Sequence, residues 1–246
     1  MFLLNDKVKI LGVGVNAVTM QEALDRIEKF FEEKKPKIIA TANAEMLMRA
    51  TYDEELKKIL NDAELVVPDG AGTVWAAHHL GYQMPERVAG YDLAQELMKR
   101  APEKNRRIYF FGSAPNVAEK AKLKAEELYP GIKIVGTRNG FFSADDESKI
   151  ISEIKSAQPD LLFAALGVPK QEKFLAKYKD ELNVPVSIGV GGTFDVMAGG
   201  MKRAPKWMQR AKLEWLFRAI LQPKRAGRLI ALPKFVLKVH SSKQKT

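Results

Sequence analysis

The amino-acid sequence predicts an α/β fold: a Rossmann-like, open and mostly parallel sheet flanked by helices, followed by a basic helical C-terminal appendage. Through the first 200 residues, short β-like runs alternate with helical stretches, which is the order of βαβ units. The β-like runs are continuously apolar, as in parallel strands that helices cover on both faces. Beyond residue 200 the chain becomes strongly basic. We therefore expect an α/β domain over residues 1–200 and a basic amphipathic appendage over residues 201–246.

The predicted strands are short and rich in Val, Ile, Leu and Phe. In chain order they cover residues 7–13, 37–43, 64–70, 106–112, 132–137, 160–167 and 184–192. Helical stretches separate most of them, and a helix that crosses over between strands is what a parallel sheet requires.

Amphipathic helices occupy the intervals between these strands. Thr19 and Glu22 have capping-box spacing, which predicts a helix that begins there and runs to about Lys35. The further helices are expected at residues 44–51, 53–61, 71–80, 92–101, 115–129, 145–157 and 169–180. Pro169 suits the first turn of the last of these.

Composition excludes several classes of protein. The 246 residues are 46% hydrophobic and include no cysteine, so the chain can bury a sizeable core but has no disulfide, thiolate nucleophile or Cys-ligated zinc. The apolar run before Asp6 is too short for a signal peptide, and no segment approaches the roughly 20 apolar residues that span a bilayer. A cytoplasmic protein is expected.

The net charge of +10 is concentrated near the C-terminus. Residues 202–245 contain 13 Lys and Arg and a single acid, Glu214, which gives this segment +12 and leaves the preceding chain slightly acidic. Such asymmetry favours an anionic partner, for which nucleic acid, a membrane surface and a phosphorylated ligand are the candidates. No known nucleic-acid-binding module is found, so we expect no nucleic-acid partner, and a nucleic-acid-binding protein with a basic arm is kept only as the remote alternative function.

Two segments of the appendage have helical apolar stripes. Residues 206–221 place Met208, Ala211, Trp215 and Ala219 on one side, and residues 228–240 do the same with Leu229, Leu232, Val236 and Val239. Cations occupy the other faces, as in helices that lie on an anionic membrane. The alternative to membrane binding is that these apolar stripes pack against the rest of the protein.

Polar and glycine residues gather where the predicted strands end. Ligands of open parallel sheets bind beyond the carboxyl ends of the strands, so this edge is the expected site. The residues concerned are Thr41, Asn43, Glu45, Asp69, Gly70, Gly112, Ser113, Gly167, Pro169, Gln171, Glu172 and Gly189 to Asp195, with Gly191 and Gly192 among the last group.

Several of these residues have both a structural and a functional interpretation. Asp69 fits a Pro-Asp-Gly turn, or a general base that accepts a proton from a substrate hydroxyl. Gln171 is harder to explain by helix capping alone, and its amide would bind a sugar or phosphate near a helix N-terminus. Arg87 is a candidate anion-binding residue, and Asp92 a candidate helix cap.

Two further kinds of site are disfavoured. His78 and His79 have no metal-ligand partner at suitable spacing and no HExxH or DxD pattern occurs, so no metal is expected. The GxGxxA sequence that begins at Gly12 imitates a dinucleotide fingerprint, but the capping box places the helix start beyond its glycines and no acid follows the next strand. A turn is favoured there over an NAD-dependent oxidoreductase.

Eight segments together resemble the WecG/TagA/CpsF glycosyltransferases (glycosyltransferase family 26), with the nearest likeness to teichoic-acid linkage-unit N-acetylmannosaminyltransferases. They extend over nearly the whole chain in order, which is more specific than any single motif. The segments are TANAEML, VVPDGAG, ERVAGYDL, FFGSAPNVAEKA, GTRNGFF, DLLFAALGVPKQEKF, GVGGTFDVMAGGMKRAPKWMQRAKLEWLFR and QPKR.

The resemblance implies an inverting transfer of N-acetylmannosamine from its UDP donor to undecaprenyl-diphosphate-linked N-acetylglucosamine, without a metal or other cofactor. Asp69 matches the family's PDG position and would be the base. Arg218, Arg225 and Arg228 match the family's C-terminal appendage and would stabilise the leaving diphosphate. The donor pocket would be lined by Thr41, Asn43, Arg87, Gln171, Glu172, Gly191, Gly192 and Asp195.

The resemblance also implies the partners and the location. An enzyme with a lipid-linked acceptor would lie on the inner face of the cell membrane as a peripheral protein, held by residues 201–246. Family members often assemble through hydrophobic faces, so the resemblance allows a homo-oligomer. No residue in this sequence identifies the face that would be used. A related transferase with another donor, such as UDP-N-acetylmannosaminuronic acid, is the nearest alternative function.

Overall fold

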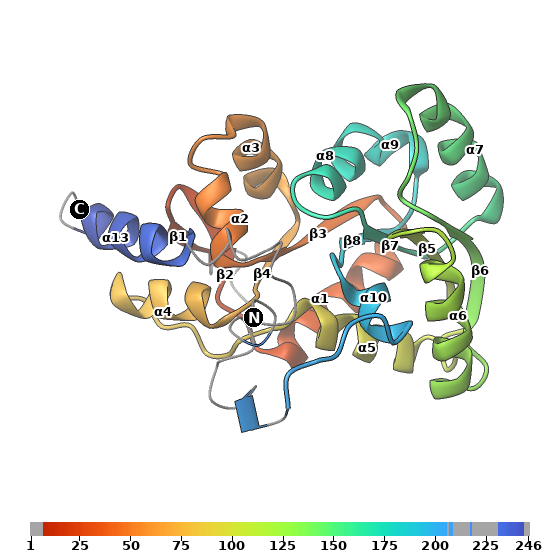
Figure 1. Ribbon diagram of the computed structural model, residues 1–246, viewed down its shortest axis with the longest axis horizontal. Helices are drawn as coiled ribbons and strands as arrows, with labels where there is room; N and C mark the ends of the chain where they lie inside the picture. The colour runs from red at the N-terminus through yellow and green to blue at the C-terminus, as the bar shows by residue number, and fades with distance from the viewer. Residues whose placement is uncertain (1–6, 206, 209–216, 218–230, 244–246) are drawn as a thin grey trace.

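The computed structural model describes residues 7–205, 207, 208, 217 and 231–243. In this part of the chain a six-stranded parallel sheet is accompanied by a two-stranded antiparallel hairpin (Figure 1). The strands are β1 (Lys7–Ile10), β2 (Val13–Asn16), β3 (Lys37–Ala42), β4 (Leu65–Pro68), β5 (Arg107–Gly112), β6 (Lys133–Arg138), β7 (Leu161–Ala165) and β8 (Val186–Gly189). The predicted α/β fold with a Rossmann-like parallel sheet is confirmed.

The strand order in the sheet is β4-β3-β8-β7-β5-β6, and every neighbouring pair is parallel. The chain builds one edge with β3 and β4, crosses to β5 and β6, and then returns to place β7 and β8 in the middle. Every residue of β4, β7 and β8 is buried, which explains why their sequences are apolar without alternation.

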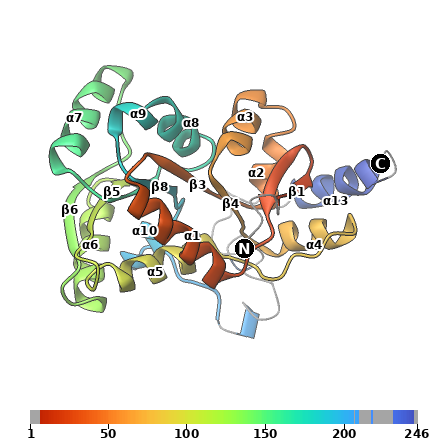
Figure 2. The ribbon, with the colours of Figure 1, turned by 180° about the vertical axis from the view of Figure 1, so that it is seen from behind.

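Helices cover both faces of the sheet, as Figures 1 and 2 show from opposite sides. Helices α2, α3, α7, α8 and α9 lie on one face, and α1, α5, α6 and α10 on the other. The helices are α1 (Met20–Glu33), α2 (Ala44–Arg49), α3 (Glu54–Asp62), α4 (Ala71–His79), α5 (Gly90–Arg100), α6 (Val117–Leu128), α7 (Glu147–Ala157), α8 (Lys170–Lys177), α9 (Lys179–Leu182), α10 (Thr193–Met197) and α13 (Ala231–Lys243), with a 3-10 turn at Ala144–Asp146.

The predicted capping box at the start of α1 is confirmed. The Thr19 hydroxyl accepts the backbone N–H of Glu22 at 3.2 Å, and the Glu22 carboxylate accepts the backbone N–H of Thr19 at 2.8 Å. The two bonds satisfy N–H groups that a helix start leaves without a partner. The bond from the Thr19 N–H, together with one from the Thr19 hydroxyl at 3.1 Å, holds the pKa of the Glu22 carboxyl below its usual value.

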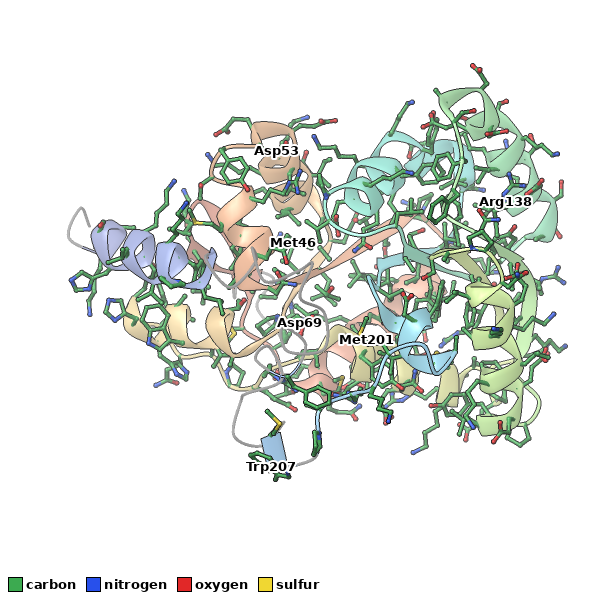
Figure 3. All side chains as sticks on the ribbon, in the orientation of Figure 1. Met46, Asp53, Asp69, Arg138, Met201 and Trp207 are labelled. Carbon is green, nitrogen blue, oxygen red and sulfur yellow. The ribbon has the colours of Figure 1, made fainter. Side chains whose placement is uncertain are left out.

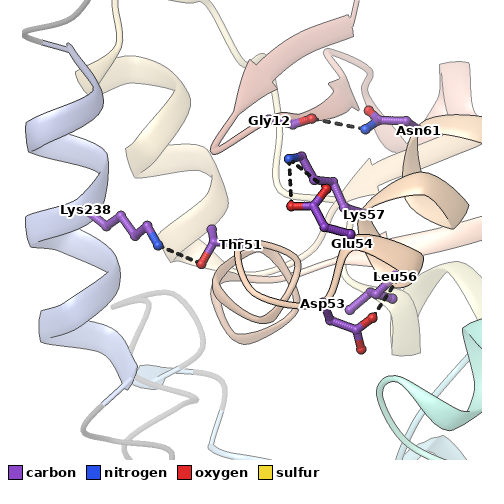
Figure 4. Close-up of polar contacts among 8 residues, drawn as sticks. All are labelled: Gly12, Thr51, Asp53, Glu54, Leu56, Lys57, Asn61 and Lys238. Carbon is purple, nitrogen blue, oxygen red and sulfur yellow. Dashed lines mark hydrogen bonds and ion pairs between the residues drawn. The ribbon is translucent and has the colours of Figure 1, made fainter.

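The first predicted strand is wrong in outline, because residues 7–16 form a hairpin rather than one strand. Leu11 and Gly12 are its two-residue turn, with φ of 49° and 88°, and both lie in the left-handed region that type I′ turns require. The side chain of Asn61 fixes this turn, since its amide donates to the Gly12 carbonyl at 3.0 Å (Figure 4). Gly12 therefore belongs to a hairpin turn, as the sequence favoured, and not to a phosphate-binding loop.

Helix α13 packs against α2 and α4, beside the β4 edge of the sheet (Figure 1). Its buried side chains are Phe235 and Val239, and Lys238 donates to the hydroxyl of Thr51 at 2.9 Å (Figure 4). Val239 and the partly buried Leu232 of the predicted stripe face the core, whereas Val236 is 43% exposed and Phe235, 1% exposed, is buried in its place. Most of residues 206–230, including the other predicted helix, lies outside the described residues, and the division into two domains stays a prediction.

Candidate active site

A cavity of about 980 Å³ lies at the carboxyl edge of the parallel sheet, lined by segments that follow β3, β4, β5, β7 and β8. Small-molecule sites usually measure about 300–1,000 Å³, so this cavity has room for a large ligand. Eight of the residues that the resemblance assigns to the site line it together: Thr41, Asn43, Asp69, Arg87, Gln171, Gly191, Gly192 and Asp195. Their roles toward a ligand stay predictions. Arg218, Arg225 and Arg228 lie outside the described residues.

Asp69 follows β4 in a turn that hydrogen bonds hold in place. Its backbone N–H donates to the Ala42 carbonyl at 3.0 Å, and its own carbonyl accepts the hydroxyl of Thr73 at 3.2 Å. The next residue, Gly70, is the N-cap residue of α4, and its φ of 88° is one that residues with a side chain rarely adopt. Figure 3 shows Asp69 near the middle of the molecule, whereas the labelled Trp207 lies at its periphery. Asp69 itself is half-buried and lines the cavity.

Arg87 reaches the same cavity from the segment between α4 and α5. The backbone N–H of Val88 donates to the Pro68 carbonyl at 3.0 Å, which ties this segment to the end of β4. The half-buried guanidinium of Arg87 and the carboxylate of Asp69 therefore belong to neighbouring segments of the cavity wall. A cavity wall that carries both an acid and a cation can bind an anion and accept a proton.

Thr41 and Asn43 lie at the end of β3 and line the cavity. The Thr41 hydroxyl donates to the Gly189 carbonyl at 3.2 Å and so joins β3 to β8. The Asn43 side-chain oxygen accepts the backbone N–H of Met46 at 2.9 Å and caps α2. Both polar side chains thus hold the backbone of the site as well as line it.

Asp195 lies in the first turn of α10 and accepts a hydrogen bond from the Ser113 hydroxyl at 3.2 Å. Ser113 has φ of 59°, and its N–H donates to the Ala165 carbonyl at 2.8 Å. Gly112 directly before it could not carry a side chain, because a Cβ would lie 2.5 Å from the carbonyl carbon of Ala165. The end of β5 is therefore pressed against the end of β7 and directs Ser113 toward Asp195.

The structure adds lining residues that the sequence prediction missed. Arg203 lines the cavity, binds the Asp92 carboxylate at 2.6 Å, and lies 4.5 Å from the ring centre of Tyr91. Asp92 is consequently not the helix cap predicted for it, because α5 begins at Gly90 with Ala89 as its cap residue. Lys170 also lines the cavity, with its ammonium 4.0 Å from the ring centre of Phe142. The sequence around Arg203 and Lys170 has no spacing signal that points to these contacts.

Gln171 and Glu172 at the start of α8 are 1% and 2% exposed. The Gln171 side chain contacts the cavity, whereas Glu172 lies behind it and is not among the lining residues. Burial raises the pKa of the Glu172 carboxyl to about 7, and the hydrogen bond from Gln171 and the charge of Arg49 oppose that rise. Glu172 is therefore the acid beneath the site rather than at its surface.

The described ranges contain neither a candidate metal cluster nor a candidate membrane span. No three His, Asp or Glu side chains in them are grouped so that they could hold a metal ion. None of the helices described there is long and apolar enough to cross a bilayer.

Comparison with known proteins agrees with the motifs. The model of the glycosyl transferase WecG/TagA/CpsF family matches residues 8–246. The chain is 38% identical over 217 residues to the N-acetylglucosaminyldiphosphoundecaprenol N-acetyl-beta-D-mannosaminyltransferase of Bacillus subtilis (strain 168), covering 88% of this chain and 84% of the relative. It is 33% identical over 241 residues to the protein of the same name from Staphylococcus aureus (strain NCTC 8325 / PS 47), covering 97% and 94%. The chain therefore belongs to the WecG/TagA/CpsF family of glycosyl transferases.

Proposed function

We propose that this protein transfers N-acetylmannosamine from UDP-N-acetylmannosamine to N-acetylglucosaminyl-diphosphoundecaprenol, in the assembly of the teichoic acid linkage unit. Family membership and the names of its relatives support the sugar and the acceptor. The observation that carries the proposal is the cavity at the sheet edge, which brings Asp69 together with Arg87, Gln171 and Asp195.

In the proposed reaction Asp69 is the general base. Its carboxylate takes the proton of the acceptor hydroxyl, and the hydroxyl oxygen attacks the anomeric carbon of the donor. The bond from that carbon to the diphosphate breaks, and UDP leaves with the electron pair. Attack on the face opposite the leaving group converts an α-linked donor into a β-linked product. The fixed backbone of the Asp69 turn supports this role because a base must be held at the reacting hydroxyl.

The leaving diphosphate needs compensating charge, which we assign to arginines rather than to a metal. Arg87 is the described candidate, and Arg218, Arg225 and Arg228 of the appendage complete the set. Gly191 and Gly192 let the donor approach the backbone, and Asp195 accepts hydrogen bonds from ribose or sugar hydroxyls. Residues 201–246 hold the enzyme on the inner face of the membrane, where the lipid-linked acceptor lies, and close over the donor.

A product assay with the full-length protein tests this proposal. UDP-N-acetylmannosamine and a lipid-diphosphate N-acetylglucosamine analogue should give UDP and a disaccharide whose new linkage is β by NMR. Asp69→Asn should lower kcat by about 10²–10⁴-fold with donor binding largely kept, because only proton transfer is lost. The matched control is Asp62→Asn, which changes an acid at an exposed surface ion pair on α3 and should leave kcat unchanged.

The product assay also distinguishes the proposed function from the nearest alternative, a related transferase with another donor sugar. Turnover with UDP-N-acetylmannosaminuronic acid, and none with UDP-N-acetylmannosamine, would replace the donor sugar in this proposal. An unchanged kcat in Asp69→Asn would remove Asp69 from the role of base.

A further inference from the structure

The side-chain amide of Gln171 joins the two glycine loops that follow β7 and β8. Its oxygen accepts the backbone N–H of Gly167 at 3.1 Å and that of Gly191 at 3.2 Å. Gly167 and Gly191 both line the cavity, so one amide oxygen fixes the separation of two parts of the cavity wall. An oxygen can accept both bonds, whereas the amide nitrogen can accept neither.

The orientation of this amide therefore decides whether the two loops are joined. An amide rotated by 180° would present its NH₂ group to two N–H donors and lose both bonds. The space around it is also restricted: a Cβ on Gly189 would lie 2.4 Å from the Gln171 amide nitrogen. Only glycine at position 189 leaves room for the amide beneath the sheet edge.

Glu172 forms a hydrogen bond with the nitrogen of the Gln171 amide. Its carboxyl oxygen Oε1 accepts a hydrogen bond from the Gln171 nitrogen at 2.7 Å, and both side chains are buried. The second oxygen, Oε2, is buried without a hydrogen-bond partner among the described residues. Burying an acid with one oxygen left unpaired costs free energy, so a residue that only filled this space would be better apolar.

We propose that Glu172 is a positioning residue: its acceptor oxygen holds the Gln171 amide in the one orientation that joins the Gly167 and Gly191 loops, and this joined wall binds the UDP part of the donor. Glu172 acts through Gln171 and does not itself contact the ligand. The identity of the ligand rests on the proposed function, whereas the coupling of Glu172 to the two loops does not.

A double-mutant cycle in the full chain tests the coupling. UDP affinity is measured by calorimetry for the wild type, Glu172→Leu, Gln171→Ala and the double variant. We expect each single change to weaken UDP binding at least fivefold, and the double variant to bind no worse than Gln171→Ala, because Glu172 has nothing left to hold. Glu172→Gln keeps an oxygen acceptor and should stay within about threefold of the wild type. The matched control is Glu181→Leu, which removes an exposed acid from the adjacent helix α9.

Hydrogen exchange supplies a readout that does not depend on the ligand. In the wild type the Gly167 and Gly191 amides should be protected, and Glu172→Leu should speed the exchange of both at least tenfold while amides in β7 and β8 keep their protection. If Glu172→Leu does not fold, Glu172→Ala completes the same cycle.

Two results would overturn the inference: additive losses of UDP affinity in the cycle, or unchanged exchange of both glycine amides. If the wild type does not bind UDP at all, the proposed function fails, and the exchange of the two amides alone then decides whether Glu172 positions Gln171.

Discussion

The polar residues of the site hold its backbone in place as well as facing the cavity. Thr41 bonds the Gly189 carbonyl, Asn43 caps α2, and Gln171 joins two loops. The sequence placed these residues at strand ends, and that part of the prediction is right. It could not show the bonds, because Thr41 and Gly189 are 148 residues apart and only the strand order makes them neighbours.

Burial of Glu172 makes the stability of the protein depend on pH. Its pKa of about 7 in the folded state exceeds the ordinary 4.5, so the folded state binds the proton more tightly than the unfolded chain does. The contribution of Glu172 to the free energy of unfolding is then greatest below about pH 4.5 and falls as the pH rises to about 7. The full loss of unfolding free energy is about 3 kcal/mol, because each unit of difference between the folded and unfolded pKa corresponds to about 1.36 kcal/mol.

We therefore expect plots of unfolding free energy against pH to differ in slope between the wild type and Glu172→Gln. Relative to the variant, the wild type should lose about 3 kcal/mol of unfolding free energy between pH 4.5 and pH 7.5. Urea denaturation at closely spaced pH values measures this difference, in which the titration of all other groups cancels. The matched control is Glu181→Gln, which removes an exposed acid from the adjacent helix α9. Parallel curves for Glu172→Gln would mean that the Glu172 carboxyl titrates normally.

At the scale of elements, the sequence predicted the helices and strands of the sheet well and missed features that depend on a tertiary partner. The turn of the β1–β2 hairpin has Leu11 at a positive φ, where Asn or Asp is the usual signal, so the turn was not recognised. The predicted helix at 169–180 is divided into α8 and α9 near Tyr178. Periodicity reports where a helix exists and does not report where packing interrupts it.

The stripe of α13 illustrates the same limit. The prediction is right for Leu232 and Val239, and only Val236 is replaced on that side by Phe235. Both positions have helical spacing from Leu232 and Val239, so the pattern alone could not separate them. Contact with α4 decides between them: the ring of Phe235 lies 6.5 Å from that of Trp75, and the His79 and His240 rings meet through nitrogens 3.1 Å apart. A large aromatic side chain gains more from this contact than valine does.

Phe235→Ala should consequently release α13 from the protein body. Removing a buried phenylalanine usually costs about 3–5 kcal/mol, and the loss should act first on the contact of α13 with α2 and α4. Hydrogen exchange should show faster exchange across α13 before the sheet is affected. The control is Leu237→Ala on the same helix, which is 67% exposed and should change stability by less than about 0.5 kcal/mol. Equal effects of the two variants would contradict the observed packing.

For the whole molecule, the edge of the sheet that carries the site was predictable, and the order of the strands was not. Parallel strands end at a common edge, so the polar residues after them were expected to meet there. Which of them are neighbours follows from the central position of β7 and β8, which no local pattern specifies. Arg203 and Asp92 are 111 residues apart in the sequence, so no local pattern predicts their pairing either.

The charge of the whole molecule carries the last prediction, which concerns the proposed membrane contact. Helix α13 lies at one end of the molecule, and α6 and α7 lie at the other (Figure 1). The exposed cations Lys234 and Lys243 belong to α13. Each cation near an anionic bilayer contributes about 1 kcal/mol, so Lys234→Gln/Lys243→Gln should weaken binding to phosphatidylglycerol vesicles by about 2 kcal/mol, or roughly 30-fold.

Vesicle sedimentation measures this partition, with pure phosphatidylcholine vesicles and high salt as conditions that should abolish it, because both remove the attraction between cations and headgroups. The matched control is Lys120→Gln/Lys155→Gln, which removes two exposed cations from α6 and α7 and the same net charge. A general attraction of a basic protein to an anionic surface would weaken equally in both double variants. A loss confined to the α13 variant would locate the contact at the end of the molecule where α13 packs beside α2 and α4, the helices that follow Asn43 and Asp69.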